Sequence, residues 1–443
     1  MNIQLSDNFT YKKLLRFTLP AIIMMIFTSI YGVVDGFFVS NYVGKTSFTA
    51  VNFIMPFLMI LGAVGFMFGT GGSALIAKTL GEGKHEKAKR LFSLFIYTTA
   101  VCGVIIAVLG IILIKPIASF LGAEGKMLDD CVTYGRIILA ALPFYMLQYE
   151  FQSFFATAEK PQIGLGVTIA AGCTNIVLDA LFVAVFKWEL VGAAAATAIS
   201  QLVGGLIPLI YFSRKNSSIL RLVKTQFDGK ALLRACTNGS SELMTNISMS
   251  IVNMLYNVQL MKYAGEDGVA AYGVMMYVNM VFLATFIGYS VGTAPISGYH
   301  YGAGNHSELK NLLKKSFIII GIFSVCMLAL SELLAYPLAK IFVGYDKELL
   351  DLTLGGFRIF SFSFLFAGIS IFGSSFFTSL NNGLVSALIS FLRTLVFQIA
   401  AVLIIPIFLG IDGIWLSIVA AEIMSVIITL IFIFKLKEKY HYI

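Results

Sequence analysis

The sequence predicts an all-α integral membrane protein in which twelve transmembrane helices form two pseudo-symmetric six-helix lobes around a central cleft. Three observations carry this prediction: a hydrophobic composition, long apolar segments that recur along the whole chain, and an internal repeat of about 222 residues. Each of these observations also limits what the protein can do.

The composition excludes an ordinary soluble protein. Of the 443 residues, 58% are hydrophobic and only 12% are charged, with a mean hydropathy of +0.89. Soluble domains average ~45–50% apolar and ~25% charged residues. The five cysteines lack CxxC spacing and lie mostly in apolar runs, which indicates small buried side chains rather than disulfides or a metal site.

Apolar segments long enough to cross ~30 Å of hydrocarbon as helices follow one another from end to end. The first is too long for a cleaved signal peptide, so we expect it to remain as a span. The expected spans are 14–40, 50–77, 91–114, 132–157, 162–186, 190–212, 233–260, 269–298, 311–335, 353–379, 384–408 and 413–434.

The distribution of basic residues predicts the orientation. Of the 31 Lys and Arg residues, 21 lie in the two tails and the even-numbered loops, and 7 lie in the odd-numbered loops. The remaining three, Arg136, Arg358 and Arg393, lie inside spans. Because the more basic side is normally cytoplasmic, we expect a multi-pass protein of the cell (plasma) membrane with both termini in the cytoplasm. Basic residues confined to short loops argue against a nucleic-acid partner.

Short motifs recur at a fixed separation. The triplet YVG at Tyr42–Gly44 returns as YAG at Tyr263–Gly265, and GEGKHEKAKRL from Gly81 returns as GAGNHSELKNL from Gly302. With six spans per repeat, both halves have the same orientation, as in transporters that work by alternating access. The expected domains are a first lobe at 1–212, a cytoplasmic linker at 213–232 and a second lobe at 233–443.

The repeated Gly-x-Gly loops do not predict a nucleotide site. A phosphate-binding loop of the Walker A type also needs a Lys-Ser/Thr pair after its second glycine, and this pair is missing. The glycines are better explained as residues that end helices in left-handed turns. We therefore expect no ATP, no cofactor, and a monomeric protein driven by an ion gradient.

Acidic residues inside the spans are few and costly. A charge at the bilayer centre costs at least ~2.5–3.5 kcal/mol, so each carboxylate should face the protein interior or water. A structural hydrogen bond inside the helix bundle is the alternative to a functional role. The acidic residues concerned are Asp35, Glu150, Asp179, Glu242 and Glu422.

Two of these acids share one depth. Asp35 and Asp179 lie about six and seven residues before the outer ends of spans 1 and 5, and Thr197 lies about seven residues into span 6. At ~1.5 Å per residue, all three lie ~10 Å below the outer surface. Asn175 shares a helix face with Asp179, one turn deeper. The sequence therefore predicts a cluster of oxygen ligands in the first lobe.

This cluster suits either of two coupling ions. Carboxylate, amide and hydroxyl oxygens are ligands for a hard cation such as Na⁺. Alternatively, one of two crowded carboxyls could carry a proton. The second half does not copy the cluster: Tyr256 occupies the position of Asp35, and the segment QIAAVLI, which matches the region of Asp179, has no acid. We therefore expect ion coupling in the first lobe.

The motifs VVDGFFVSNYVG, GTGGSALIAKTLGEG, TNIVLDALF and VGTAPISGYHYGAGN, together with the repeat, resemble the multidrug and toxic compound extrusion (MATE) transporters over nearly the full length. The resemblance implies a cation site at Asp35, Asn175, Asp179 and Thr197, and a hinge at Pro20. Some relatives use a span 7 glutamate, to which Glu242 corresponds loosely. Their span 10 aspartate has no counterpart in FRIFSFSFLFAGISIFG.

The expected function is secondary antiport: amphipathic or cationic organic compounds leave in exchange for Na⁺ or H⁺, with membrane lipid around the protein. Methionine and aromatic side chains fit such cargo because their surfaces adapt to many shapes and attract cations. Most of these side chains only face lipid or pack helices. The candidates for a cargo cleft are Met55, Tyr145, Gln148, Met276 and Tyr277.

Two alternative functions fit the sequence less well. A flippase for lipid-linked oligosaccharides, from a related exporter family, would need a strongly cationic cavity, and only three arginines lie within spans. An intramembrane enzyme is not expected, because the chain has no HExxH pair, no aspartate-rich diphosphate motif and no histidine inside a clear apolar run.

Overall fold

The computed structural model describes residues 3–43, 45–344 and 346–442, with side chains except at 36, 37, 40, 41, 45, 46 and 48. Gly44, in the first repeat triplet, lies outside the described residues. The helices, of which η denotes a π-helical turn, are α1 (Tyr11–Phe38), η1 (Val39–Val43), α2 (Lys45–Gly81), α3 (His85–Phe120), α4 (Gly125–Thr157), α5 (Pro161–Asp179), η2 (Ala180–Val185), α6 (Glu189–Ser213), α7 (Gly229–Gly302), α8 (His306–Val343), α9 (Lys347–Ser361), α10 (Phe364–Ser379), α11 (Gly383–Phe391), η3 (Leu392–Val396) and α12 (Phe397–Tyr440).

The described chain crosses the membrane twelve times. Nine segments are long and apolar enough to span, and α9 with α10, bent by 48°, forms a tenth. Helix α7 has 74 residues, about 110 Å if straight, and it turns back at Gly265, whose φ is 62°. The segment Gly383–Tyr440 divides in the same way at Gly410, with φ 59°. Both breaks use glycine because other residues rarely adopt positive φ. The predicted twelve-helix architecture is confirmed.

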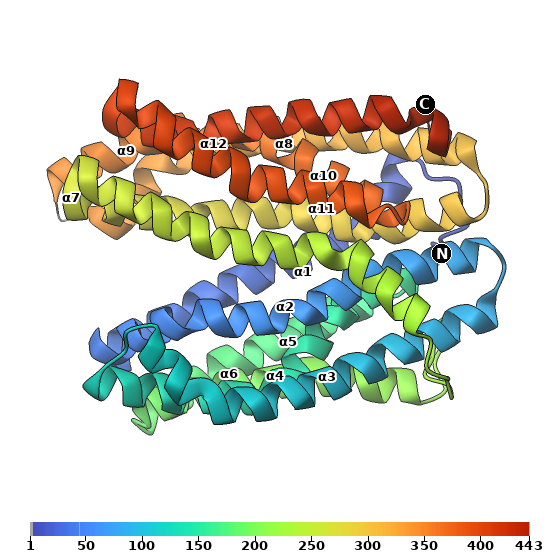
Figure 1. Cartoon of the computed structure of the whole chain (residues 1–443), viewed down its shortest axis with the longest axis horizontal. Helices are drawn as coiled ribbons and strands as arrows, with labels where there is room; N and C mark the ends of the chain where they lie inside the picture. The colour runs from blue at the N-terminus through green and yellow to red at the C-terminus, as the bar shows by residue number, and fades with distance from the viewer. Residues whose placement is uncertain (1–2, 44, 345, 443) are drawn as a thin grey trace.

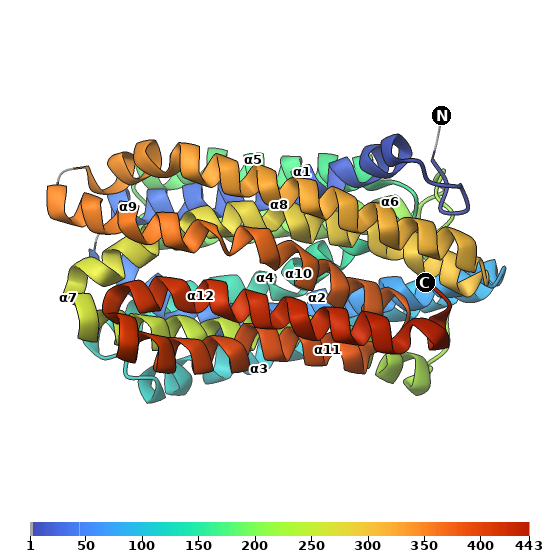
Figure 2. The ribbon, with the colours of Figure 1, turned by 90° about the horizontal axis from the view of Figure 1, so that it is seen from above.

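The helices form two lobes that lie side by side along the long axis of the molecule (Figure 1). Helices α1–α6 make the first lobe, drawn blue to green, and α7–α12 make the second, drawn yellow to red. Both chain termini lie at the same end, which the turned view also shows (Figure 2). We call this the terminal end and the opposite one the far end.

The two lobes touch closely at the terminal end through α2 and α7. A Cβ added to Gly81 would lie 2.0 Å from the carbonyl oxygen of Tyr299, and one added to Gly302 would lie 2.1 Å from the carbonyl oxygen of Lys78. Tyr299 and Gly302 are the repeat counterparts of Lys78 and Gly81, each 221 residues later. The same contact is therefore made twice, as in an isologous interface, and only glycine allows the helices to come so close.

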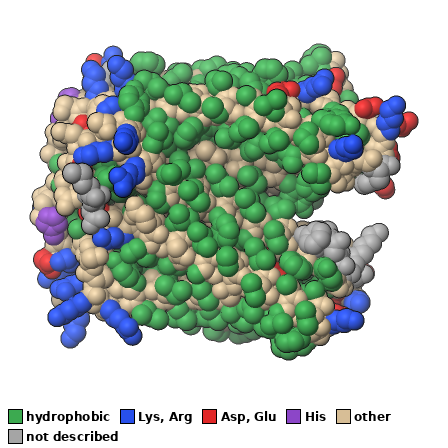
Figure 3. All heavy atoms as spheres, turned by 180° about the vertical axis from the view of Figure 1, so that it is seen from behind, with side chains coloured by type: hydrophobic (Ala, Val, Ile, Leu, Met, Phe, Trp, Pro, Cys, Tyr) green, Lys and Arg blue, Asp and Glu red, His purple; other side chains and the backbone are tan. Residues whose placement is uncertain are grey.

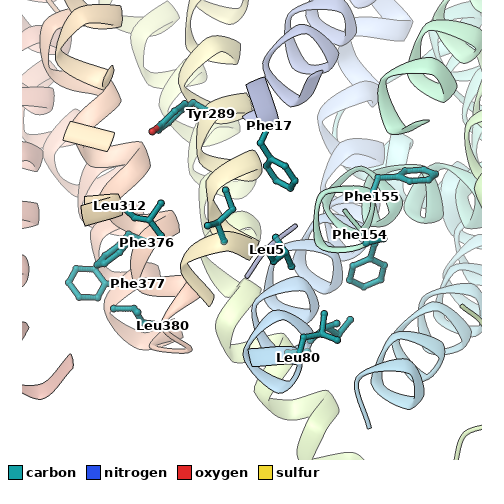
Figure 4. Close-up of a cluster of buried hydrophobic side chains, with 14 of the residues drawn as sticks. Leu5, Phe17, Leu80, Phe154, Phe155, Tyr289, Leu312, Phe376, Phe377 and Leu380 are labelled. Carbon is teal, nitrogen blue, oxygen red and sulfur yellow. The ribbon is translucent and has the colours of Figure 1, made fainter. Parts of the chain in front are cut away.

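The buried hydrophobic side chains show where the lobes join and where they part. One cluster contains residues of both lobes, among them Phe17, Phe154, Leu312 and Phe376, and lies at the terminal end (Figure 4). Two further clusters are local: one runs from Val39 to Ala194 in the first lobe, and the other from Val252 to Ile418 in the second. In the space-filling view a notch separates the lobes at the far end (Figure 3). The molecule is closed at the terminal end and open at the far end.

The surface fits a membrane setting. Large hydrophobic side chains are exposed along the middle of the molecule, and Lys and Arg gather at the terminal end (Figure 3). The connection between the lobes runs from Ser213 to α7, which begins at Gly229, so the last residues of the expected linker are helical. The Asp228 side chain caps α7, accepting bonds of 3.1 Å from the backbone N–H groups of Lys230 and Ala231.

Candidate ion-binding site

Four polar residues predicted from the sequence meet inside the first lobe. Helix α1 carries Asp35, α5 carries Asn175 and Asp179, and α6 carries Thr197. The Thr197 hydroxyl donates to Asp35 Oδ1 at 3.2 Å, and Asn175 Nδ2 approaches Thr197 Oγ1 at 3.5 Å. Helix α1 is thus joined through one hydroxyl to α5 and α6, which lie much later in the sequence.

Asp179 completes the group but is not satisfied by it. Its side chain is 0% exposed, and neither carboxyl oxygen receives a hydrogen bond in the part of the chain that the structure describes. Its neighbour is the carboxyl of Asp35, which is itself an acceptor unless it carries a proton. Buried carboxylates without a donor are costly, so the pair needs a cation or a proton between or beside its oxygens.

Each aspartate lies close to a change in helix geometry. Helix α5 ends at Asp179 and continues directly as the π-helical turn η2, and α1 passes into the π-helical turn η1 four residues after Asp35. A π-helical turn accommodates one extra residue and weakens the regular hydrogen-bond ladder, and such turns are frequent at functional sites. Nothing in the local sequence predicted these turns.

Tyr134 of α4 is a fifth member of the site that the sequence reasoning missed. Its side chain is 0% exposed, and its hydroxyl lies 3.8 Å from the sulfur of Met55. The phenol also interacts with the Thr197 side chain and lies near both aspartates. Its expected depth, two residues into a span that begins near 132, is only ~3 Å below the outer surface, well above the level expected for the acids. A tyrosine near a membrane interface is also too common to stand out.

Besides Met55, which contacts Tyr134, two of the five expected cleft residues lie beside the site. Gln148 of α4 is buried and lies close to Tyr31, one helical turn before Asp35 on α1. The ring of Tyr145 packs edge-to-face on Tyr149, with centroids 4.7 Å apart. These aromatic and amide groups therefore lie next to the aspartate pair within the first lobe.

The other two expected cleft residues are in the second lobe. Met276 is partly buried, and its sulfur lies 4.0 Å from Asn279 Nδ2. Tyr277 is 44% exposed and stacks on Phe342 of α8, with centroids 6.1 Å apart. The structure does not bring these two residues into contact with the group around Asp35.

Pro20 and Glu242 occupy separate places. Pro20 lies buried inside α1, which runs through it as one continuous helix. Glu242 lies on α7, where its backbone carbonyl accepts a bond of 2.8 Å from Asn246. Among the described residues, no contact joins Glu242 to the aspartate pair.

In the corresponding region of the second lobe, polar side chains are paired with one another. The hydroxyl of Tyr256, the counterpart of Asp35, donates to Gln398 Oε1 at 2.7 Å. Close by, Arg393 binds Glu422 through three contacts of 2.8, 2.9 and 3.1 Å, and both side chains are largely buried. Because the guanidinium binds both carboxylate oxygens, these oxygens are not free to bind an exchangeable cation. The sequence had shown both charges inside spans but not that they pair.

A comparison with protein families finds one match, to the family described as MatE, at residues 20–181 and again at 243–404. Multidrug export protein MepA of Staphylococcus haemolyticus (strain JCSC1435) is 26% identical over 431 residues, which is 97% of this chain and 94% of that protein. MepA of Staphylococcus saprophyticus is 25% identical over 437 residues, with the same coverage.

Solved structures show the same fold. The outward-facing conformation of a multidrug resistance MATE family transporter of the MOP superfamily superimposes with a TM-score of 0.92, at 23% identity and 99% of both chains. A MATE complex with MaL6 also gives 0.92, over 97% of this chain and 98% of that one. Because the two MatE matches together cover most of the sequence, this chain belongs to the MatE family, the MATE transporters, and it is a transporter rather than an enzyme.

Proposed function

We propose that this protein is a secondary antiporter of the cell membrane that exports amphipathic, often cationic, organic compounds in exchange for Na⁺ or H⁺. The multidrug export activity named for the MepA relatives supports this cargo class. The first lobe supplies the coupling ion site, and the cleft between the lobes supplies the cargo path.

The aspartate pair carries the proposal. The carboxyl of Asp179 on α5 is buried, and that of Asp35 on α1 is partly buried. The two lie next to each other, with the hydroxyl of Thr197 and the amide of Asn175 beside them. With the site empty of a cation or proton, the carboxylates repel each other. When the site is loaded, Na⁺ ligation or a shared proton draws α1, α5 and α6 together.

Ion binding would act on cargo through α1. With both termini in the cytoplasm, the open far end faces outside, so this conformation is outward-open. Pro20 cannot donate a backbone hydrogen bond, and α1 can therefore bend there when its outer half is drawn toward α5. Tyr31, one turn from Asp35, links this movement to Gln148 and the neighbouring aromatic rings. An ion drives release only by binding one conformation more tightly than the other.

In the second lobe the buried arginine is already paired with a carboxylate, which disfavours a lipid-linked oligosaccharide flippase. A pyrophosphate cargo needs unpaired cationic side chains in its path. Arg393 is neutralised by Glu422 within the second lobe. A guanidinium with a buried carboxylate partner is not available to an anionic cargo.

Ethidium efflux from reconstituted vesicles tests the proposal, with Na⁺ and proton gradients imposed separately. We expect Asp35→Asn and Asp179→Asn each to lower gradient-driven efflux roughly tenfold or more, within the range of coupling free energies of ~1–3 kcal/mol. Asp412→Asn, at an exposed position at the far end of the second lobe, is the matched control and should transport normally. Efflux that is unchanged in both site variants would overturn the assignment, and the gradient that supports wild-type efflux identifies the ion.

A further inference from the structure

The segment before α1, residues 3–10, has no role in the function proposed above, yet it is firmly held. It is not helical, but the side chains of Leu5 and Phe9 are 0% and 1% exposed. Figure 4 shows Leu5 between side chains of the two lobes, with Leu312 on one side and Phe154 on the other. A short terminal segment normally frays unless something ties it down.

One end of the segment is attached to the first lobe. The backbone N–H of Leu5 donates to Glu159 Oε1 at 2.7 Å, in the turn between α4 and α5. A tight turn precedes the helix: the N–H of Asp7 donates to the carbonyl of Gln4 at 3.2 Å, and Lys13 of α1 pairs with the Asp7 carboxylate at 3.3 Å. The segment therefore moves with the first lobe.

The other attachment crosses to the second lobe. The N–H of Phe9 donates to Glu308 Oε1 at 2.8 Å, and its carbonyl accepts from Asn311 Nδ2 at 3.3 Å and from Lys315 Nζ. Asn311 also holds both Glu308 oxygens at 3.0 Å, so the α8 side of this contact is pre-formed. The rings of Phe9 and His300 on α7 form a T-shaped pair, with centroids 6.4 Å apart.

We propose that residues 3–10 are a latch, bound in a site built from both lobes, that holds the terminal end closed. The inference rests on the alternating access of the proposed function. When the lobes part at this end, α1 and the Leu5–Glu159 contact stay with the first lobe. The bonds from Phe9 to Glu308, Asn311 and Lys315 must then break, so the latch favours the outward-open conformation.

Pulsed electron paramagnetic resonance tests the latch in lipid nanodiscs, without cargo or an ion gradient. Spin labels on cysteines at Lys87 of α3 and Lys310 of α8, both exposed, report the separation of the lobes once the five native cysteines are replaced. We expect Phe9→Ala to raise the ratio of the long-distance to the short-distance population about tenfold, because a buried ring and its packing are lost. Asn8→Ala, at the exposed neighbouring position, is the matched control and should match the parent protein.

Two further measurements keep the result interpretable. Glu308→Gln retains the shape of the site but weakens its bond to Phe9, and we expect the same shift in a smaller amount. Deletion of residues 2–9 should open the terminal end, and a synthetic peptide MNIQLSDNFT should reverse this at high concentration. Distances in Phe9→Ala and Glu308→Gln that equal those in Asn8→Ala would refute the latch. That result leaves the ion site untouched, since Asp35→Asn is judged by efflux alone.

Discussion

Thr197 is the residue at which α1, α5 and α6 meet. Its hydroxyl donates to Asp35 and faces the amide of Asn175, so it orients a carboxylate of the proposed ion site. A valine has the same shape but cannot donate, and hydrogen bonds to charged groups contribute ~1.5–3 kcal/mol. We expect Thr197→Val to raise the ion concentration for half-maximal ethidium efflux by about tenfold or more.

The conservative variant separates this role from packing. Thr197→Ser keeps the hydroxyl and should retain an ion dependence close to that of the wild type. The amount of folded protein, measured by size-exclusion chromatography in detergent, should be the same for both variants. An unchanged ion dependence in Thr197→Val would show that the hydroxyl does not orient Asp35.

At the residue scale, the sequence predicts acids better than their partners. Asp35 and Asp179 stand out because carboxylates in apolar helices are rare and costly, and their depths could be counted along the spans. Tyr134 does not stand out, because a tyrosine near a membrane interface is unremarkable. The pairing of Arg393 with Glu422 depends on how two helices are rotated toward each other, and a hydropathy pattern does not specify that rotation.

Helices α2 and α7 cross at their glycines, and this close approach fixes the closed terminal end. A methyl group on Gly81 would lie 2.0 Å from the Tyr299 carbonyl oxygen, which is backbone and cannot turn aside. Overpacking of this kind costs typically ~1–3 kcal/mol. We expect Gly81→Ala to destabilise the closed terminal end and, in the spin-label experiment, to increase the long-distance population.

Gly166 of α5 provides the control for Gly81. It is helical and exposed, and a Cβ added there meets nothing within 4 Å. Gly166→Ala should leave the distances unchanged and can even stabilise the helix, since alanine has the higher helix propensity. If Gly81→Ala behaves like Gly166→Ala, the crossing at these glycines does not limit opening.

At the element scale, apolar length predicts the spans, but not their ends or irregularities. Helix α3 runs from His85 to Phe120, well beyond the expected 91–114, because hydropathy marks the hydrocarbon region while a helix can continue into the interface. The π-helical turns and the broken pair α9–α10 also escaped prediction. Hydropathy does not specify where a helix takes a π-helical turn or breaks.

In the whole molecule, the two halves of the repeat share one fold but differ in their buried polar and charged side chains. The MatE match recurs over 162 residues in each half, and the glycine crossing is made twice about the same axis. The first lobe nevertheless contains unsatisfied carboxylates, whereas the second contains Tyr256–Gln398 and Arg393–Glu422. In the proposed function the aspartate pair of the first lobe changes its charge, whereas Arg393 and Glu422 of the second lobe already neutralise each other. We therefore expect the two lobes to respond differently to the coupling ion.

The distribution of the buried clusters indicates which parts move as units. Two clusters each belong to a single lobe, and the large shared cluster lies at the terminal end. A small fourth cluster joins Ala21, Met24 and Met25 of α1 to Ala284 of α7. Opening the terminal end therefore requires these shared clusters, the glycine crossing and the latch to separate. Each lobe keeps its own core, which favours rocking of nearly rigid bodies over refolding.

A disulfide across the terminal end tests this rocking directly. A Cβ added to Gly298 of α7 would lie 3.1 Å from the Cβ of Ala77 on α2, slightly below the ~3.5–4.5 Å usual for a disulfide. We expect Ala77→Cys with Gly298→Cys to form the bond under oxidation with a small shift of the helices. Ethidium efflux should then stop and return with reductant, because transport requires the lobes to part there, while each single variant should be insensitive to oxidation. Efflux that continues in the oxidised double variant would mean that cargo leaves without separation of α2 and α7.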